Sequence, residues 1–193
     1  HHPLSWFDNF LKLPLKKKRS ANDKRTALIR ELFDTILHTS LVHLANSSTV
    51  RIAQHARLKE YFDKEKHTSR RPYIFCNRGI NGIEGSVSAA VGLAAGSKKE
   101  TLLLVGDLSF FYDRNGLWNN YVKGGELPDG GHLHLSVLLL NNGGGRIFRN
   151  IPGMEQAPYR DTMVSGKHST SAEGVAVESG CDYRSVDAGD ISD

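Results

Sequence analysis

Two short apolar runs, each followed by polar residues and glycine, decide the fold of this chain. The first is Leu102-Leu103-Leu104-Val105 followed by Gly106-Asp107-Leu108-Ser109, and the second is Val137-Leu138-Leu139-Leu140 followed by Asn141-Asn142-Gly143-Gly144-Gly145. Short continuous apolar runs are typical of buried strands in a parallel sheet. We therefore expect two parallel strands whose carboxyl ends bring Asp107 and Asn142 to the same edge of one sheet.

The residues at these two strand ends suit a cation with an anionic ligand. A carboxylate from Asp107 and an amide oxygen from Asn142 are hard oxygen ligands of the kind that Mg²⁺ prefers, and Mg²⁺ often keeps phosphate oxygens as further ligands. The neighbouring glycines leave the backbone open to close approach by a ligand. The pattern predicts a cation-held diphosphate at this edge. A helix cap at Asp107 and an Asx turn at Asn142 are the plainer alternatives.

The same order of strand and helix recurs along the chain. Further strands are expected at 41–45 and 73–76, and the strand before Asn141 begins at His134. Helices are expected at 28–37, 50–62, 86–95, 115–121 (with Asp113 as a cap) and 170–179, followed by a strand start at 183–186. This alternation predicts an α/β fold with a doubly wound, mainly parallel sheet flanked by helices.

Composition argues against several classes of protein. The chain has 193 residues, of which 39% are hydrophobic, which suits one domain (20–193) behind an N-terminal extension (1–19). No apolar run approaches the roughly 18 residues of a membrane span. The net charge of +4 comes mostly from Lys16-Lys17-Lys18-Arg19, where no aromatic residues interleave, so a solvated segment is a better interpretation than nucleic-acid binding. Two cysteines form no disulfide framework, which favours the cytoplasm.

Three motifs in order resemble those of a known enzyme family. They are Asn77-Arg78-Gly79-Ile80-Asn81-Gly82-Ile83-Glu84-Gly85, then Gly106-Asp107-Leu108-Ser109-Phe110-Phe111-Tyr112-Asp113, then Asn141-Asn142-Gly143-Gly144-Gly145-Arg146-Ile147-Phe148. Gly-Asp-x-Ser followed by Asn-Asn-x-Gly resembles the cofactor motif of thiamine-diphosphate enzymes. The three blocks together resemble the 2-succinyl-5-enolpyruvyl-6-hydroxy-3-cyclohexene-1-carboxylate (SEPHCHC) synthases of menaquinone biosynthesis, from about Leu41 to about Tyr183. The resemblance implies the thiamine-diphosphate-binding fold.

The resemblance also implies a cofactor site. Mg²⁺ (or Mn²⁺) would be held by Asp107, the Asn142 side chain and the carbonyl of Gly144, and Ser109 and nearby amides would bind the diphosphate. The implied cofactor-binding residues are Gly106, Asp107, Leu108, Ser109, Ile83, Asn142, Gly144, Ile147 and Phe148. Ile83 would hold the cofactor bent, while Ile147, Phe148 and Ile151 would wall the pocket, with core packing as the alternative. The interval between Asp107 and Asn142 exceeds the family's usual one, so we expect 123–132 to loop out before the strand.

Arg78, Arg51 and Ser47 follow strand ends, and the resemblance makes them the substrate-contacting, catalytic set. The implied substrates are 2-oxoglutarate and isochorismate, whose carboxylates suit the guanidinium fork; a surface ion pair is the alternative. Thiamine diphosphate would support decarboxylation of 2-oxoglutarate and addition of the resulting carbanion to isochorismate. An activating glutamate would come from the pyrimidine-binding domain of a second subunit. We therefore expect a homo-oligomeric, three-domain enzyme of which this chain is a catalytically silent part.

Other interpretations remain open. Another thiamine-diphosphate enzyme, of the acetolactate synthase or 2-oxoacid decarboxylase type, is the nearest, and a non-catalytic nucleotide-binding module is more distant. A dinucleotide oxidoreductase is disfavoured because no Gly-x-Gly-x-x-Gly follows the first strand. His132 and His134 fit alternation on a strand edge better than a metal site. Glu84 fits a helix cap or an arginine partner better than a general base.

Overall fold

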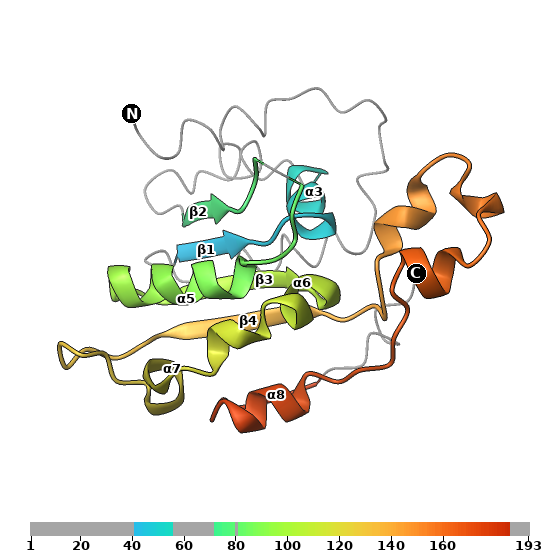
Figure 1. Ribbon diagram of the computed structural model, residues 1–193. Coiled ribbons are helices and arrows are strands. Elements are labelled where there is room, and N and C mark those ends of the chain that lie inside the picture. The colour runs from blue at the N-terminus through green and yellow to red at the C-terminus, as the bar shows by residue number, and fades with distance from the viewer. Residues whose placement is uncertain (1–40, 56–71, 80, 186–193) are drawn as a thin grey trace.

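Four parallel strands form the centre of the computed structural model, which describes residues 41–55, 72–79 and 81–185. The strands β1 (Leu41–Leu44), β2 (Tyr73–Cys76), β3 (Thr101–Gly106) and β4 (Leu135–Leu140) lie in the order β2-β1-β3-β4 (Figure 1). The strand sequence therefore runs outward from β1 to β2 and then crosses back to β3. Since such crossovers are right-handed, this reversal puts the connecting helices on opposite faces of the sheet. The predicted α/β class and doubly wound parallel sheet are confirmed.

Helices and short helical turns connect and cover the strands. The α-helices are α3 (Ser48–His55), α5 (Ser86–Ser97), α6 (Asp107–Tyr112), α7 (Asn120–Gly124) and α8 (Glu173–Glu178). Shorter turns are η1 (Arg114–Leu117), η2 (Arg146–Asn150), η3 (Met154–Gln156) and the π-helical turn η4 (Arg160–Val164). The helix α5 lies across the near face of the sheet in Figure 1. Its small residues allow this close approach, since Ala90 and Ala94 are fully buried.

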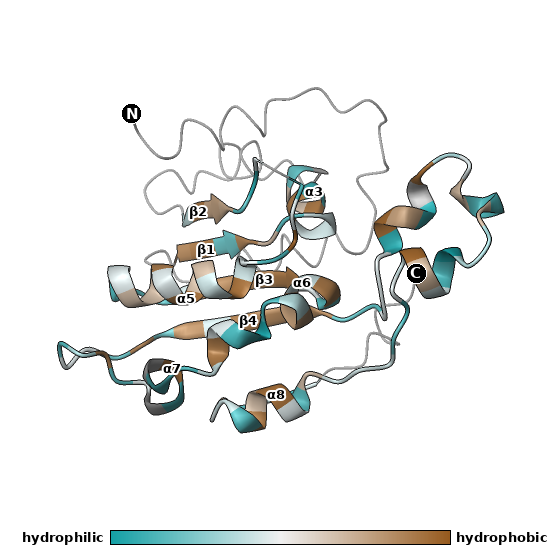
Figure 2. Ribbon diagram, viewed as in Figure 1, coloured by the Kyte–Doolittle hydropathy of each residue, from teal (hydrophilic) through white to brown (hydrophobic). Residues whose placement is uncertain are grey.

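The central strand β3 is apolar on both of its faces. Leu103 and Val105 pack with Val87 and Ala90 of α5 and with Phe110 of α6. Because successive side chains of a strand point to opposite faces, Leu104 lies on the other side of the sheet, where it is also fully buried. Figure 2 shows the strands as largely hydrophobic ribbons. Burial on both faces explains why the sequence of β3 is a continuous apolar run and not an alternating one.

The single helix predicted at 115–121 is wrong, whereas the strands predicted at 41–45, 73–76, 102–105 and 134–140 agree with β1 to β4 to within a residue at each end. Helix α6 begins at Asp107 directly after β3, and η1 and α7 occupy the predicted helical range. Asp113, expected to cap that helix, instead accepts hydrogen bonds from the backbone N and the Oγ of Ser88, both at 2.7 Å. The first turn of any helix has N–H groups without partners inside the helix. The carboxylate of Asp113 therefore serves the first turn of α5.

Some of the remaining predicted elements can be compared with the structure, and others lie outside the described residues. The helix predicted at 170–179 is present as α8, but no strand begins within 183–185. The predicted surplus, 123–132, includes the end of α7 and a loop closed by an antiparallel bridge between Glu126 and His132. This loop precedes β4, at the end of the sheet away from Asn141 (Figure 1). The extension 1–19, the helix 28–37 and the far part of the helix 50–62 lie outside the described residues. Within the described ranges, no helix has the length and apolar character needed to cross a membrane.

Candidate functional site

The carboxyl ends of β3 and β4 meet around the side chain of Asp107. Its Oδ1 accepts a hydrogen bond from the backbone N–H of Leu108 at 2.7 Å. Its Oδ2 accepts from the backbone N–H groups of Asn142 at 3.1 Å and Gly144 at 2.8 Å. The residue is only 3% exposed. The two polar strand ends therefore converge as the sequence predicts.

The loop after β4, residues 141–145, requires glycine at its centre; we call it the glycine loop. Gly143 has a φ of 74° and Gly144 a φ of 140°. A Cβ on Gly144 would lie 2.9 Å from the carbonyl oxygen of Ser165, and a Cβ on Gly143 would lie 3.0 Å from that of His168. A side chain at Gly144 would therefore clash with the clasp, and one at Gly143 would be strained and tightly packed, so glycine suits both positions.

A second segment, residues 165–170, holds the glycine loop in place; we call it the clasp. The Gly145 N–H donates to the Ser165 carbonyl at 2.7 Å, and the His168 N–H donates to the Gly143 carbonyl at 3.1 Å. The Nδ2 of Asn141 donates to the carbonyl of Thr170 at 2.9 Å. Sequence reasoning missed the clasp because it lies outside the three motifs. The only signal was the pair Ser165-Gly166, which is typical of turns.

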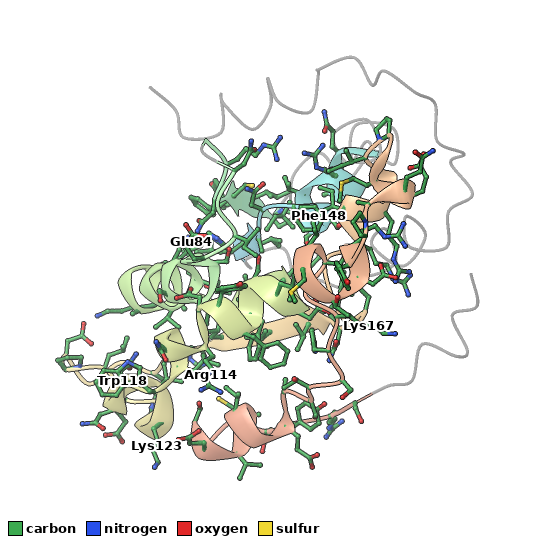
Figure 3. All side chains as sticks on the ribbon, turned by 45° about the vertical axis from the view of Figure 1, so that its right-hand side comes forward. Glu84, Arg114, Trp118, Lys123, Phe148 and Lys167 are labelled. Atoms are coloured by element: carbon green, nitrogen blue, oxygen red, sulfur yellow. The ribbon has the colours of Figure 1, made fainter. Side chains whose placement is uncertain are left out.

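A pocket on the glycine loop carries positive charge. Its lining residues are Asn142, Gly143, Gly144, Gly145, Arg146, Arg149, Ser165 and Lys167. Of the three cationic side chains, Arg149 is partly neutralised by Asp161, with 3.5 Å between Nε and Oδ1. Figure 3 shows Lys167 on the side of the molecule away from Trp118 and Lys123. Ser165 Oγ is buried without a hydrogen-bond partner among the described residues. A small cationic pocket with an unsatisfied hydroxyl suits an anion.

The predicted cation ligands lie together, although their contacts differ from the expected ones. Asn142 reaches Asp107 through its backbone N–H, while the residue as a whole is exposed. The carbonyl of Gly144 accepts one hydrogen bond, from the Arg146 N–H at 3.0 Å, and a carbonyl oxygen has a second lone pair for a further partner. Among the residues that the structure describes, no three His, Cys, Asp or Glu side chains gather as a metal site. The predicted cation ligands include one side chain of these four types, that of Asp107. The other two predicted ligands are the amide oxygen of Asn142 and the carbonyl oxygen of Gly144.

The predicted diphosphate contacts lie around the same carboxylate. Ser109 is buried in the first turn of α6, and Leu108 and Gly106 are half-buried beside it. The N–H of Gly143, expected to face a diphosphate, donates to Oδ1 of Asn141 at 3.2 Å. A diphosphate that binds the Gly143 N–H would have to replace this contact.

The predicted substrate-contacting residues lie at the carboxyl ends of β1 and β2. Arg78 Nη1 donates to Asn46 Oδ1 at 2.8 Å, and Asn46 Nδ2 donates to the Gly82 carbonyl at 2.7 Å. Ser47 has a φ of 78°, a left-handed conformation that is uncommon outside glycine. Arg51 is exposed on α3. These residues lie on the same edge of the sheet as Asp107, since β1 is next to β3 and β2 lies beyond β1.

Of the predicted apolar residues, Ile83, Ile147 and Phe148 are half-buried, whereas Ile151, also expected to wall the pocket, is exposed. Ile83 lies in the loop before α5, and its N–H donates to Oε2 of Glu84 at 2.9 Å. Glu84, expected to cap a helix or pair with an arginine, therefore bonds within its own loop, and α5 has no side-chain cap at Gly85. Ile147 and Phe148 lie in η2, and the Phe148 ring is so close to Gly145 that a Cβ there would be 2.8 Å from it. His132 and His134 have ring centroids 6.3 Å apart, at the other end of β4.

Cys76, at the end of β2, should be a poor nucleophile. Burial raises the pKa of its thiol to about 11, although the positive charge of Arg78 lowers this pKa in part. Because only the thiolate reacts, a Cys181→Ser variant should react with a thiol reagent at pH 7.5 on the order of 100-fold more slowly than free cysteine, and faster only as the pH nears 11. The same protein in guanidinium chloride should react at the free rate. Rapid labelling of folded Cys76 near pH 8 would disprove this assignment.

The chain has close relatives among curated proteins, although no protein-family model matches it. It is 40% identical over 185 residues to the 2-succinyl-5-enolpyruvyl-6-hydroxy-3-cyclohexene-1-carboxylate synthase of Bacteroides fragilis, covering 96% of this chain and 29% of that protein. The chain is a homologue of the SEPHCHC synthases. The family resemblance that the three motifs predicted is therefore confirmed.

Two further SEPHCHC synthases are also similar to this chain. That of Phocaeicola vulgatus is 39% identical over 188 residues, covering 96% of this chain and 29% of the relative. That of Flavobacterium johnsoniae is 34% identical over 160 residues, covering 83% and 26% respectively. The chain thus spans less than a third of the length of these SEPHCHC synthases.

Proposed function

We propose that this chain is the diphosphate-binding domain of a SEPHCHC synthase, formed by residues 20–193 behind an extension at 1–19. The observation that carries the proposal is the convergence of Asp107 with the glycine loop at the carboxyl ends of β3 and β4. The identity of 40% over 96% of the chain supports the assignment to this enzyme family. The absence of a disulfide at Cys76 and Cys181 supports a cytoplasmic location.

The residues present fit a cation and thiamine diphosphate. Asp107, the Asn142 side chain and the Gly144 carbonyl supply the hard oxygens that Mg²⁺ or Mn²⁺ requires. Positive φ values at Gly143 and Gly144 set the course of the glycine loop, and the backbone of the clasp lies where side chains on these residues would project. Ser165 Oγ is a buried hydroxyl without a partner among the described residues, and Ser165 lines the same pocket as the glycine loop. Arg146 and Lys167 add charge that an anionic diphosphate would neutralise.

Arg78, Arg51 and Ser47 are the proposed substrate-binding residues for 2-oxoglutarate and isochorismate. Arg78 is held by Asn46, so its guanidinium is oriented before a substrate carboxylate binds. When bound, thiamine diphosphate would supply the carbanion chemistry of a decarboxylation followed by an addition. Ile83, Ile147 and Phe148 would exclude water from the reacting groups, since all three are half-buried and apolar. The pyrimidine-binding domain of a second subunit would complete the site.

The test is product formation by a complete enzyme that carries this sequence. We expect SEPHCHC from 2-oxoglutarate and isochorismate, no product when pyruvate replaces 2-oxoglutarate, and no turnover by the 193-residue chain alone. Efficient use of pyruvate would favour an enzyme of the acetolactate synthase or decarboxylase type. Turnover by the isolated chain would contradict the proposed need for another domain.

Arg78→Ala in the complete enzyme should lower kcat/KM for SEPHCHC formation by about 10- to 100-fold. The substitution removes a charged hydrogen-bond donor, which contributes on the order of 1.5–3 kcal/mol. Arg114, an exposed residue of η1, offers the matched control, because Arg114→Ala removes the same charge from another part of the surface. Equal kcat/KM for the two variants would show that Arg78 does not contact substrate.

A further inference from the structure

His168 of the clasp lies against Asp107, although it belongs to none of the three motifs. Its Nε2 is 3.3 Å from Oδ2 of Asp107, and the two side chains are 16% and 4% exposed. The approach lacks good hydrogen-bond geometry, so Nε2 has no hydrogen-bond partner among the described residues. A buried ring nitrogen beside a proposed cation ligand calls for a functional reason.

The hydrogen bond at the other ring nitrogen, Nδ1, determines whether Nε2 of His168 can donate a proton or bind a cation. The backbone N–H of Thr170 donates to Nδ1 at 3.1 Å, so Nδ1 carries a lone pair and Nε2 carries the proton of the neutral ring. A ring that binds a cation through Nε2 would need its proton on Nδ1, facing the Thr170 N–H. The hydrogen bond at Nδ1 therefore leaves Nε2 as the donor of the neutral ring, 3.3 Å from Oδ2 of Asp107, and not as a cation ligand.

Packing and backbone contacts hold this ring in place. The Phe111 ring of α6 meets it edge to face, with 5.3 Å between centroids and 87° between planes. The backbone N–H of His168 donates to the carbonyl of Gly143 at 3.1 Å. One residue of the clasp thus contacts both the carboxylate after β3 and the glycine loop after β4.

The two oxygens of Asp107 have different surroundings. Oδ2 faces the N–H groups of Asn142 and Gly144 and the Nε2 of His168. Among the described residues, Oδ1 accepts one hydrogen bond, from the N–H of Leu108. Oδ2 therefore has more donors around it than Oδ1 in this part of the chain.

We propose that His168 is a positioning residue that directs its Nε2–H at Oδ2 of Asp107 and so presents Oδ1 to the cation. The proposal rests on the function proposed above, because it concerns the same cation site. Outer hydrogen bonds to a ligating carboxylate orient it, and their loss typically weakens metal affinity by about 10- to 100-fold.

Titration of a complete enzyme that carries this sequence with Mn²⁺ at saturating thiamine diphosphate, followed by electron paramagnetic resonance, tests the proposal. His168→Phe keeps an aromatic ring against Phe111 and removes the donor, and it should weaken Mn²⁺ affinity by about 10- to 100-fold. His168→Gln keeps an N–H donor and should recover part of the affinity. His168→Leu replaces the phenylalanine variant if that variant does not fold.

Phe111→Leu is the matched control, because it loosens the packing of the ring and leaves the donor in place. It should lower the melting temperature and leave Mn²⁺ affinity within about threefold of wild type. Wild-type affinity in folded His168→Phe or His168→Leu, or equal losses in these variants and in Phe111→Leu, would overturn the positioning role. Absence of thiamine-diphosphate-dependent Mn²⁺ binding by the wild-type complete enzyme would instead overturn the proposed function, and the positioning role with it.

Discussion

Asp107→Asn should abolish measurable binding of Mg²⁺ with thiamine diphosphate and lower the free energy of unfolding by about 1–3 kcal/mol. The substitution removes the charge and replaces one acceptor oxygen by an NH₂ group. That group would face backbone N–H donors, because Oδ1 and Oδ2 both accept N–H groups in the folded chain. Calorimetry would measure the loss of binding, which we expect to exceed about 100-fold, and urea denaturation would measure the loss of stability.

Asp113→Asn is the matched control for this substitution. Asp113 also accepts two hydrogen bonds, from the backbone N and the Oγ of Ser88, but it serves the first turn of α5 and not the glycine loop. This variant should lose about 1 kcal/mol of stability and bind the cofactor as the wild type does. The assignment of Asp107 as a cation ligand fails if both variants retain Mg²⁺-dependent binding.

Gly144→Ala should destabilise the chain by about 2–4 kcal/mol and disrupt the glycine loop. At a φ of 140° an alanine is strained, and its Cβ would lie 2.9 Å from the carbonyl oxygen of Ser165. The clasp would have to move. The hydrogen bond of 2.8 Å from the Gly144 N–H to Oδ2 of Asp107 would then be disturbed. Denaturant unfolding measures the first effect, and cofactor titration of the remaining folded protein measures the second.

Gly92→Ala separates this effect from the general cost of replacing glycine. Gly92 lies in the middle of α5, is exposed, and has open space around the position of an added Cβ. Alanine there should stabilise the chain by up to about 1 kcal/mol, since glycine disfavours a helix interior. A Gly144→Ala variant as stable as the wild type would show that the loop does not need the conformation described.

The four strands, in their order along the chain, could be predicted because a strand that is buried on both faces has a continuous apolar sequence. The run 102–105 is apolar at every position since β3 is covered on both faces, and the polar residues that follow mark where β3 ends. Parallel strands then bring Asp107 and Asn142 to one edge whatever the loops between them do. The sequence therefore predicted that Asp107 and Asn142 lie close together.

The details that the sequence did not reveal depend on contacts between distant residues. Whether Asp113 caps its own helix or α5 depends on how closely Ser88 approaches it, and no local pattern records that distance. The clasp could not be predicted for the same reason. Ser165 and His168 contact the glycine loop and Asp107 only because the folded chain brings residues 165–170 back beside them. Asn142 was predicted through its side chain, but its backbone N–H makes the observed bond to Asp107.

The central claim is that Asp107 and the glycine loop hold a cation and a diphosphate together. Calorimetric titration of a complete enzyme that carries this sequence with thiamine diphosphate, with Mg²⁺ and then with Mg²⁺ removed by a chelator, tests it most directly. We expect saturable binding of one cofactor per chain that requires Mg²⁺. Binding that is unchanged when Mg²⁺ is removed, or no binding in either condition, would contradict the claim.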